Sequence, residues 1–207
     1  MKLYFKAGAC SLSPHIVLRE SGLDFTAVSV DLTSKKTEQN QDYFALNPKG
    51  KVPALELDDG TVLTETVAIV QYIADLKPDR RLLAPAGCVG RYQTLAWLNF
   101  IATDLQAPFY LLYSEDIPDE CSLTIRNRLQ KNFQWLNDEV NDRQWLMGQH
   151  FTVADACLFT VVRWAKAAKL TLTGMDALAV WFERVAERPA VAAALQAEGL
   201  EDVPGAH

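Results

Sequence analysis

The sequence predicts an α/β domain followed by an all-helical domain. Over residues 1–79, short apolar runs typical of strands alternate with helical patterns, whereas no strand pattern appears beyond residue 88. Between the two parts, the stretch KPDRRLLAPAG contains two prolines and a charge run, which is typical of a linker. We therefore expect domains at 1–79 and 88–207, joined by a linker at 80–87.

A hairpin and a helix are expected to complete the α/β domain. The apolar runs VPALEL and TVLT are separated by DDG, and the Asp59–Gly60 pair is a strong signal for a turn between antiparallel strands. The segment ETVAIVQYIADL then carries apolar residues at helical spacing. The elements expected before them are a strand at 2–5, a helix at 14–21 that ends near Gly22, a strand at 26–32 and a short helix within the polar segment 33–50.

The second domain is expected to contain helices only. Residues 151–169 are apolar on nearly every side, which predicts a helix at the centre of the core. A long helix before it is expected to be disturbed at Pro108, because proline lacks a backbone N–H. The predicted helices cover 88–113, 120–141, 151–169 and 177–188, and the fold closes before Pro189.

Composition and charge exclude several kinds of partner. The chain has 207 residues, a net charge of -6 and a pI of about 5.1, which opposes general affinity for nucleic acid or anionic membranes. No window offers the roughly 20 apolar residues of a membrane span, and the N-terminus lacks the apolar run of a cleaved signal peptide. The cysteines and histidines are too scattered for a metal site, so we expect reduced thiols, a cytoplasmic protein and no metal. These residues are Cys10, Cys88, Cys121, Cys157, His15, His150 and His207.

The stretch AGACSLSPHIVLRE places Cys10 at a turn that opens a helix. Free N–H groups and the positive end of the helix dipole favour a thiolate there, and such cysteines are often reactive. The hydroxyl of Ser11 is expected to donate a hydrogen bond to this thiolate. No second cysteine follows within one turn, so an external thiol must resolve any disulfide that Cys10 forms. The alternative is a small apolar residue that plugs the start of the helix.

Two further segments offer groups that suit a peptide ligand. In NPKGKVPAL, Pro53 pushes Val52 into an extended conformation that would present its N–H and C=O outward, in a tighter turn if their bond is cis. In LTETVAIV, Thr66 and the free N–H groups of a helix start suit a carboxylate, and Glu65 suits an ammonium. The alternatives are a proline that merely opens a strand and a helix cap without a ligand. With the cation of Lys35, these groups would satisfy a small anionic peptide that contains cysteine.

Polar residues also follow one face of the long helix in the second domain. Asn99, Thr103 and Gln106 are spaced i, i+4 and i+7, so a regular helix would place them on one side, opposite an apolar stripe. A helix of this kind suits the wall of a cleft between two domains. A plain solvated face is the alternative. Trp164, on the expected central helix, either packs in the core or borders such a cleft.

These motifs together resemble the cytosolic glutathione transferases, and the bacterial beta class in particular. The resemblance lies in ACSLSPHIVLRE, NPKGKVPAL and LTETVAIVQYIAD, and in GQHFTVAD, which matches the family signature Gly-x-x-x-Thr-x-x-Asp. In that signature Thr152 caps a helix and Asp155 reaches back to it, a structural capping box that touches no substrate. The resemblance implies a thioredoxin-like first domain, a helical second domain, a homodimer, and glutathione as co-substrate without a further cofactor.

The resemblance assigns the first domain to glutathione. By position, Cys10 is the cysteine that faces the glutathione sulfur or forms a mixed disulfide with it. Lys35 matches a contact to the glycyl end, and the backbone of Val52 matches the partner of the cysteinyl unit. Glu65 and Thr66 match the γ-glutamyl site, where the family usually has Gly or Ser at the second position.

The resemblance also implies that the long helix contributes to the site. Asn99 and Thr103 lie on this helix, and Asp104 is expected to reach the glutathione of the partner subunit. The family has a histidine at the place of Gln106, which is counted here with Cys10 and Ser11 among the catalytic candidates. Glutamine cannot take up a proton near neutral pH, so this departure weakens the expectation that a titrating group lies beside Cys10.

Three functions follow as hypotheses. The leading one is a transferase that lowers the thiol pKa of glutathione and delivers it to a small hydrophobic electrophile. The second is glutathione-dependent thiol–disulfide or peroxide reduction through a mixed disulfide on Cys10. The third is a non-catalytic adaptor that keeps only the fold. The joint presence of Cys10, Val52, Glu65 and Thr66 argues against an adaptor, because protein contacts require none of them.

Overall fold

The α/β part contains a five-stranded mixed sheet. The computed structural model describes residues 1–114 and 117–200. The strand order is β3-β2-β1-β4-β5, and β1 runs parallel to β2 while the remaining neighbours are antiparallel. The strands are β1 (Lys2–Phe5), β2 (Thr26–Asp31), β3 (Lys36–Thr37), β4 (Ala54–Glu56) and β5 (Val62–Thr64), and the helices are α1 (Leu12–Ser21), α2 (Tyr43–Leu46) and α3 (Thr66–Leu76).

The predicted hairpin is confirmed, and one strand was not expected. β4 and β5 pair antiparallel around the turn, where Gly60 has φ +84°, a conformation that favours glycine. The short strand β3 pairs with the end of β2. A strand of two residues shows no alternation of polar and apolar side chains, so no sequence pattern marks it. The order is therefore β-α-β-β-α-β-β-α rather than the predicted β-α-β-α-β-β-α.

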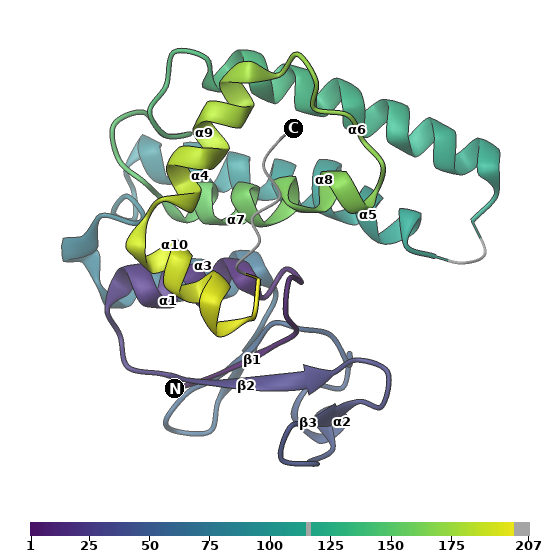
Figure 1. Cartoon of the computed structure of the whole chain (residues 1–207). Helices are drawn as coiled ribbons and strands as arrows, with labels where there is room; N and C mark the ends of the chain where they lie inside the picture. Colours follow the sequence, from purple (N-terminus) through teal and green to yellow (C-terminus); the bar gives the residue numbers. More distant parts are fainter. Residues whose placement is uncertain (115–116, 201–207) are drawn as a thin grey trace.

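Helix α1 lies between the sheet and the helical part of the molecule, as Figure 1 shows. It begins at Leu12, two residues earlier than predicted, and ends at Gly22, whose φ of 70° makes a left-handed cap. It packs against α3, α7 (Val153–Val162) and α10 (Pro189–Ala197). The segment that carries Cys10 therefore connects the sheet to a helix that is covered by the second half of the chain.

The long helix of the second half is interrupted in the turn that precedes Pro108. A π-helix, η2 (Ile101–Gln106), separates α4 (Val89–Phe100) from α5 (Ala107–Leu112). Pro108 cannot donate a helical hydrogen bond to the Asp104 carbonyl, which instead accepts one from the side-chain amide of Asn132 at 3.0 Å. The expectation of a disturbance at Pro108 is therefore confirmed, since η2 occupies the turn that precedes this proline. The wider turns of η2 also mean that regular α-helical spacing does not hold between Asn99 and Gln106.

The predicted central helix and its capping box are confirmed. Every residue of α7 is buried, and Thr152 and Asp155 make both hydrogen bonds of the box. The expected single helix over 151–169 divides at Arg163 into α7 and the short α8 (Trp164–Ala167). The other helices are α6 (Asp119–Val140), α9 (Asp176–Ala186) and α10, and the short 3₁₀ helix η1 is Pro78–Arg80.

Helix α10 was missed, because Pro189 was interpreted as the end of the fold. Proline is favoured in the first turn of a helix, and Pro189 is the first residue of α10. The helix covers α1 (Figure 1), so the end of the chain's second half closes over the start of the first.

The described residues form two clusters of buried hydrophobic side chains, and the two halves of the chain share the larger one. That cluster contains residues from β1, α1 and α3 together with residues from α4 to α10, whereas the smaller one lies within the α/β part. The division at 80–87 stays a prediction, and residues 201–207, including His207, lie outside the described residues. Among residues 88–114 and 117–200 the structure contains no strand. Within the described ranges, no helix is long and apolar enough to cross a membrane.

Candidate active site

Cys10 lies at the junction between the sheet and the helical part. Its side chain is buried in the loop between β1 and α1. The thiol donates a hydrogen bond to the carbonyl oxygen of Val52 (Sγ–O 3.1 Å) and accepts one from the hydroxyl of Tyr110 (O–Sγ 3.0 Å). Val52 precedes β4 and Tyr110 belongs to α5, so three distant segments meet at this sulfur.

The surroundings of Cys10 favour a thiol rather than the expected thiolate. Burial raises the pKa of Cys10 above its ordinary value, and hydrogen bonds with Tyr110 and Thr66 offset only part of that increase. The helix proper begins two residues later, at Leu12. Burial therefore works against the thiolate that the start of the helix was expected to favour.

Ser11 is turned away from the cysteine. Its hydroxyl accepts a hydrogen bond from the Lys6 N–H (3.1 Å) and donates one to the Lys6 carbonyl (3.2 Å). Both groups lie just beyond β1, and Ser11 itself is fully buried. The prediction that Ser11 donates to Cys10 is wrong, because the side chain closes the turn that leads into α1.

The segment before β4 presents one backbone group of Val52 and hides the other. The Val52–Pro53 bond is cis. The carbonyl of Val52 faces Cys10, so the expectation that both its backbone groups point outward is wrong for the carbonyl. Within the described chain, no hydrogen bond uses the N–H of Val52. The hydroxyl of Tyr43 and the side-chain amide of Asn47 hold the preceding carbonyl, that of Lys51, at 2.9 and 2.7 Å.

The start of α3 has an unusual backbone conformation. Glu65 has φ 72° and ψ 121°, a region that residues other than glycine rarely adopt. Backbone strain of this kind often occurs at functional sites. The carboxylate of Glu65 pairs with the ammonium of Lys49, which also donates to the Thr64 hydroxyl at 3.0 Å. Thr66 beside it is buried. The sequence did not single out Lys49, whose role depends on a contact across 16 residues.

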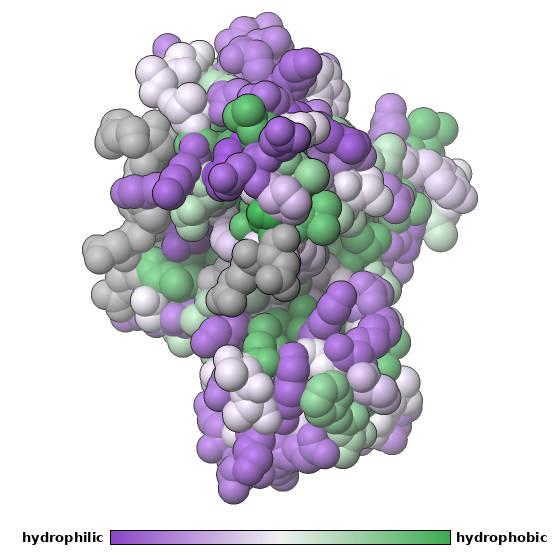
Figure 2. All heavy atoms as spheres, turned by 90° about the vertical axis from the view of Figure 1, so that its right-hand side faces the viewer, coloured by the Kyte–Doolittle hydropathy of each residue, from purple (hydrophilic) through white to green (hydrophobic). Residues whose placement is uncertain are grey.

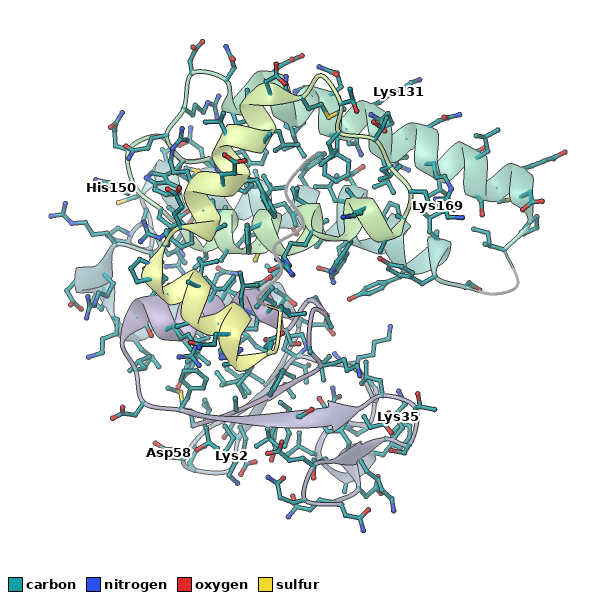
Figure 3. All side chains as sticks on the ribbon, in the orientation of Figure 1. Lys2, Lys35, Asp58, Lys131, His150 and Lys169 are labelled. Carbon is teal, nitrogen blue, oxygen red and sulfur yellow. The ribbon has the colours of Figure 1, made fainter. Side chains whose placement is uncertain are left out.

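Lys35 lies just beyond the end of β2 (Figure 3). Its ammonium donates a hydrogen bond to the Gly50 carbonyl at 2.8 Å and lies 5.9 Å from the centre of the Phe44 ring. These contacts hold the cation against the loop that leads to Val52.

Only one of the candidates on the long helix is connected to Cys10. The side-chain amide of Gln106 donates to the Tyr110 hydroxyl at 3.0 Å, and that hydroxyl donates to the sulfur. Asn99 instead donates to a carbonyl of its own helix at 2.8 Å, and the Thr103 hydroxyl oxygen lies 2.9 Å from another. The structure therefore brings Gln106 into the site and leaves Asn99 and Thr103 on an exposed face.

Asp104 is engaged within its own chain. Arg128 of α6 donates to its carboxylate at 2.6 Å, and the Thr103 hydroxyl donates to it at 2.8 Å. The Thr103 hydrogen bond and the Arg128 charge hold the pKa of Asp104 below its ordinary value. A contact between Asp104 and a neighbouring subunit would have to compete with Arg128.

Tyr110 is the residue of the site that sequence reasoning missed. Partial burial, followed by the proximity of Cys10, raises the pKa of its phenol, so the hydroxyl remains a hydrogen-bond donor. One signal was present: Tyr110 follows Gln106 by four residues, which places the two on one helical face. Trp164 packs near it, with the ring centres 6.0 Å apart, and is buried.

Comparison with known proteins identifies the family. A model of the glutathione S-transferase N-terminal domain matches residues 7–76, and a model of the C-terminal domain matches residues 100–189. Glutathione S-transferase GstA of Escherichia coli O157:H7 is 57% identical over 97% of this chain and 100% of its own length. The chain therefore belongs to the glutathione S-transferase family.

Solved structures bear out the beta class. A bacterial beta class glutathione S-transferase from Sphingomonas chungbukensis has a TM-score of 0.93 and 41% identity, covering 97% of this chain and 100% of its own. A sphingomonad glutathione S-transferase solved with glutathione matches with the same TM-score, identity and coverage. The predicted architecture, a thioredoxin-like domain followed by a helical domain, agrees with these relatives.

Proposed function

We propose that the protein is a glutathione transferase that joins glutathione to small hydrophobic electrophiles. The observation that carries the proposal is the meeting of three groups at one place: the Cys10 thiol, the unengaged N–H of Val52 and the start of α3 at Thr66. A thiol, a peptide edge and a helix start are what a cysteine-containing peptide needs. The relatives described as glutathione S-transferases support the same conclusion.

Each part of glutathione has a complementary group. The γ-glutamyl carboxylate suits the N–H groups at the start of α3 and the Thr66 hydroxyl, and its ammonium suits Glu65. The carbonyl of the cysteinyl unit suits the free Val52 N–H, as in strand addition. The glycyl carboxylate suits the cation of Lys35. This arrangement would place the glutathione sulfur beside Cys10.

Conjugation requires a thiolate of glutathione. The glutathione thiol loses its proton to solvent, its sulfur forms a bond to the electrophilic carbon, and the leaving group departs with the bonding electrons. A hydroxyl donor such as Tyr110 stabilises the sulfur anion. Exposed apolar side chains on α5 and after it, those of Leu111 and Tyr113, suit the hydrophobic acceptor. Figure 2 shows apolar residues between the helical part and the smaller lobe below it.

A second candidate activity rests on Cys10 itself. All four cysteines are free, and Cys10 is buried at the place proposed for the glutathione sulfur. Its thiolate would attack the glutathione sulfur of a substrate's mixed disulfide with glutathione, release the substrate thiolate and leave a disulfide between Cys10 and glutathione. A second glutathione thiolate would then attack that disulfide, restore the Cys10 thiolate and form glutathione disulfide, so that the substrate is reduced and two glutathione units are oxidised. The free thiols also support our proposal that the protein works in the reducing cytoplasm.

Calorimetric titration with glutathione, followed by a conjugation assay with an activated aryl chloride, tests the proposed function. Saturable binding and enzyme-dependent loss of the thiol are expected. An absence of binding would contradict the proposal.

Replacing Thr66 with valine is expected to weaken glutathione binding by about 1–3 kcal/mol, because the bound carboxylate then loses a hydroxyl donor in a buried place. Valine keeps the shape of the side chain. Thr61→Val, on the exposed turn of the hairpin, is the matched control and should not change affinity. Equal affinities for Thr66→Val and the wild type would remove Thr66 from the binding site.

Replacing Gln106 with histidine is expected to add a limb near pH 6.5 to the pH profile of turnover, since an unperturbed histidine titrates at about that value. The new imidazole would act on Cys10 and the glutathione sulfur through Tyr110. The profile of kcat/KM from pH 5 to 9 measures this. Identical profiles for both proteins would show that position 106 does not influence the reacting sulfur.

We also propose a homodimer, with Asp104 directed to the neighbouring site. Val89 and Tyr92 lie three residues apart on α4, and these residues are 72% and 60% exposed. Large apolar side chains grouped on one helix face favour a contact with another subunit. Light scattering at micromolar concentration is expected to give twice the 23.1 kDa mass of the chain. A monomer mass would overturn this assignment.

A further inference from the structure

The end of α10 holds the loop that carries Cys10. The carboxylate of Glu198, which follows the last turn of α10, accepts a hydrogen bond from the Gly8 N–H (2.9 Å) and one from Nδ1 of His15 (2.8 Å). The side chains of Glu198 and His15 are fully buried. Gly8 lies two residues before Cys10, so a residue from the end of the chain reaches the start of the proposed active site.

The hydrogen bond between Arg19 and His15 determines which nitrogen of the imidazole donates to Glu198. Nε of Arg19 donates to Nε2 of His15 at 3.1 Å, so the imidazole proton lies on Nδ1 and is donated to Glu198. Both carboxylate oxygens of Glu198 therefore serve as acceptors. Burial lowers the pKa of Arg163, and the negative charge of Glu198 acts in the opposite direction.

The other backbone group of Gly8 is held from the helical part as well. The indole Nε1 of Trp164 donates to the Gly8 carbonyl at 2.8 Å. Gly8 has φ +72°, a conformation that favours glycine, and a Cβ there would contact the side chain of Leu200 at 3.7 Å. Glu198 and Trp164 thus fix one peptide turn from two sides, while Ser11 fixes the turn at Lys6 from within the α/β part.

We propose that Glu198 is a positioning residue for the reaction: by holding the Gly8 N–H, it keeps Cys10 at the place where the glutathione sulfur must arrive. This inference rests on the proposed glutathione site. The groups that would bind the ends of glutathione, at Lys35, Glu65 and Thr66, lie on other segments. Loss of Glu198 should therefore affect the reacting sulfur more than glutathione affinity.

A second contact of α10 provides a control that distinguishes positioning of the Cys10 loop from simple anchoring of the helix. At the opposite end of the helix, Arg188 pairs with Glu20 of α1 through two hydrogen bonds of 2.6 and 2.9 Å. This pair also ties α10 to α1 but does not reach Gly8. Glu20→Gln therefore serves as the control for Glu198→Gln. Both changes weaken the contact between α10 and α1, but they do so at opposite ends of α10.

The test compares these variants in a Cys88→Ser/Cys121→Ser background, which removes the two exposed thiols. Glu198→Gln is expected to lower kcat for disulfide reduction, the reaction that uses the Cys10 thiol, about 10- to 100-fold, since small misplacements of reacting groups have effects of that size. The affinity for glutathione should change less than about threefold. Glu198→Gln should also speed labelling of Cys10 by 5,5′-dithiobis(2-nitrobenzoic acid) about tenfold, because the loop opens more often. Glu20→Gln should match the background in both rates.

Equal effects of Glu198→Gln and Glu20→Gln on kcat and on labelling would overturn the inference. If Glu198→Gln does not fold, Trp164→Phe, which releases the Gly8 carbonyl and retains an aromatic ring, takes its place with the same expected and contradicting results. If the background protein binds no glutathione, the proposed function fails. The labelling rates then still decide whether Glu198 holds the Cys10 loop.

Discussion

Cys10→Ala is expected to abolish the mixed disulfide with glutathione while leaving glutathione affinity nearly unchanged. The proposed contacts to the two ends of the tripeptide come from Lys35, Glu65 and Thr66, and none of them needs the sulfur of Cys10. Alanine removes only a small buried side chain from the loop. Disulfide-reductase activity should fall at least about 10²-fold, because no protein thiol remains to form the covalent intermediate.

Mass spectrometry after incubation with glutathione disulfide, together with calorimetry, measures both expectations. Because burial raises the pKa of Cys10, the adduct in the wild type should form faster as the pH rises through neutrality and above. Cys88→Ala is the matched control, since this exposed cysteine lies outside the site. Wild-type reductase activity in Cys10→Ala would show that the cysteine is only a packing residue.

Asp155→Asn is expected to lower the free energy of unfolding by about 3 kcal/mol near neutral pH, since buried donors would lose their acceptor. The carboxylate is fully buried and accepts hydrogen bonds from the Thr152 N–H and hydroxyl, the Leu146 N–H and the Trp181 indole, at 2.8 to 3.3 Å. An amide would turn its NH₂ toward some of these donors. Urea unfolding measures the change. The exposed Asp176 in the first turn of α9 provides the control, and Asp176→Asn should change stability by less than about 0.5 kcal/mol.

The same residue should make stability depend on pH. Burial raises the pKa of Asp155 from 3.8 to about 6, so between these values the folded state binds the proton more tightly than the unfolded state does. The contribution of Asp155 to stability therefore falls as the pH rises from about 4 to about 6, by at most about 3 kcal/mol. The difference between the wild type and Asp155→Asn should accordingly be larger at pH 4 than at pH 7. A difference that grows with pH would contradict this assignment.

Local patterns predicted the elements whose signals lie within a few neighbouring residues. The Asp59–Gly60 turn specified its hairpin, and the apolar run after Thr152 specified the buried helix α7. Helix α10 was missed because Pro189 has two meanings, the end of one helix or the first turn of another. Pro108 indicated a disturbance of the long helix but not its form, the π-helix η2, which shifts the face on which Asn99 and Gln106 were expected to meet.

The candidate site could be predicted only in part, for reasons of tertiary packing. Cys10, Val52 and Thr66 each lie beside a turn or helix start that the sequence marks, and the structure places them near one another. The raised pKa of Cys10 could not be predicted, since it depends on burial by segments 42 and 100 residues away. Tyr110 lay outside any motif for the same reason.

The central claim is that glutathione binds along the α/β part with its sulfur beside Cys10. A crystal structure of the protein with glutathione tests it most directly. The proposal predicts the γ-glutamyl end at Glu65 and Thr66, a hydrogen bond from the Val52 N–H to the cysteinyl unit, and the sulfur in contact with Cys10 or bonded to it. Glutathione held elsewhere, or with its sulfur turned away from Cys10, would contradict the claim.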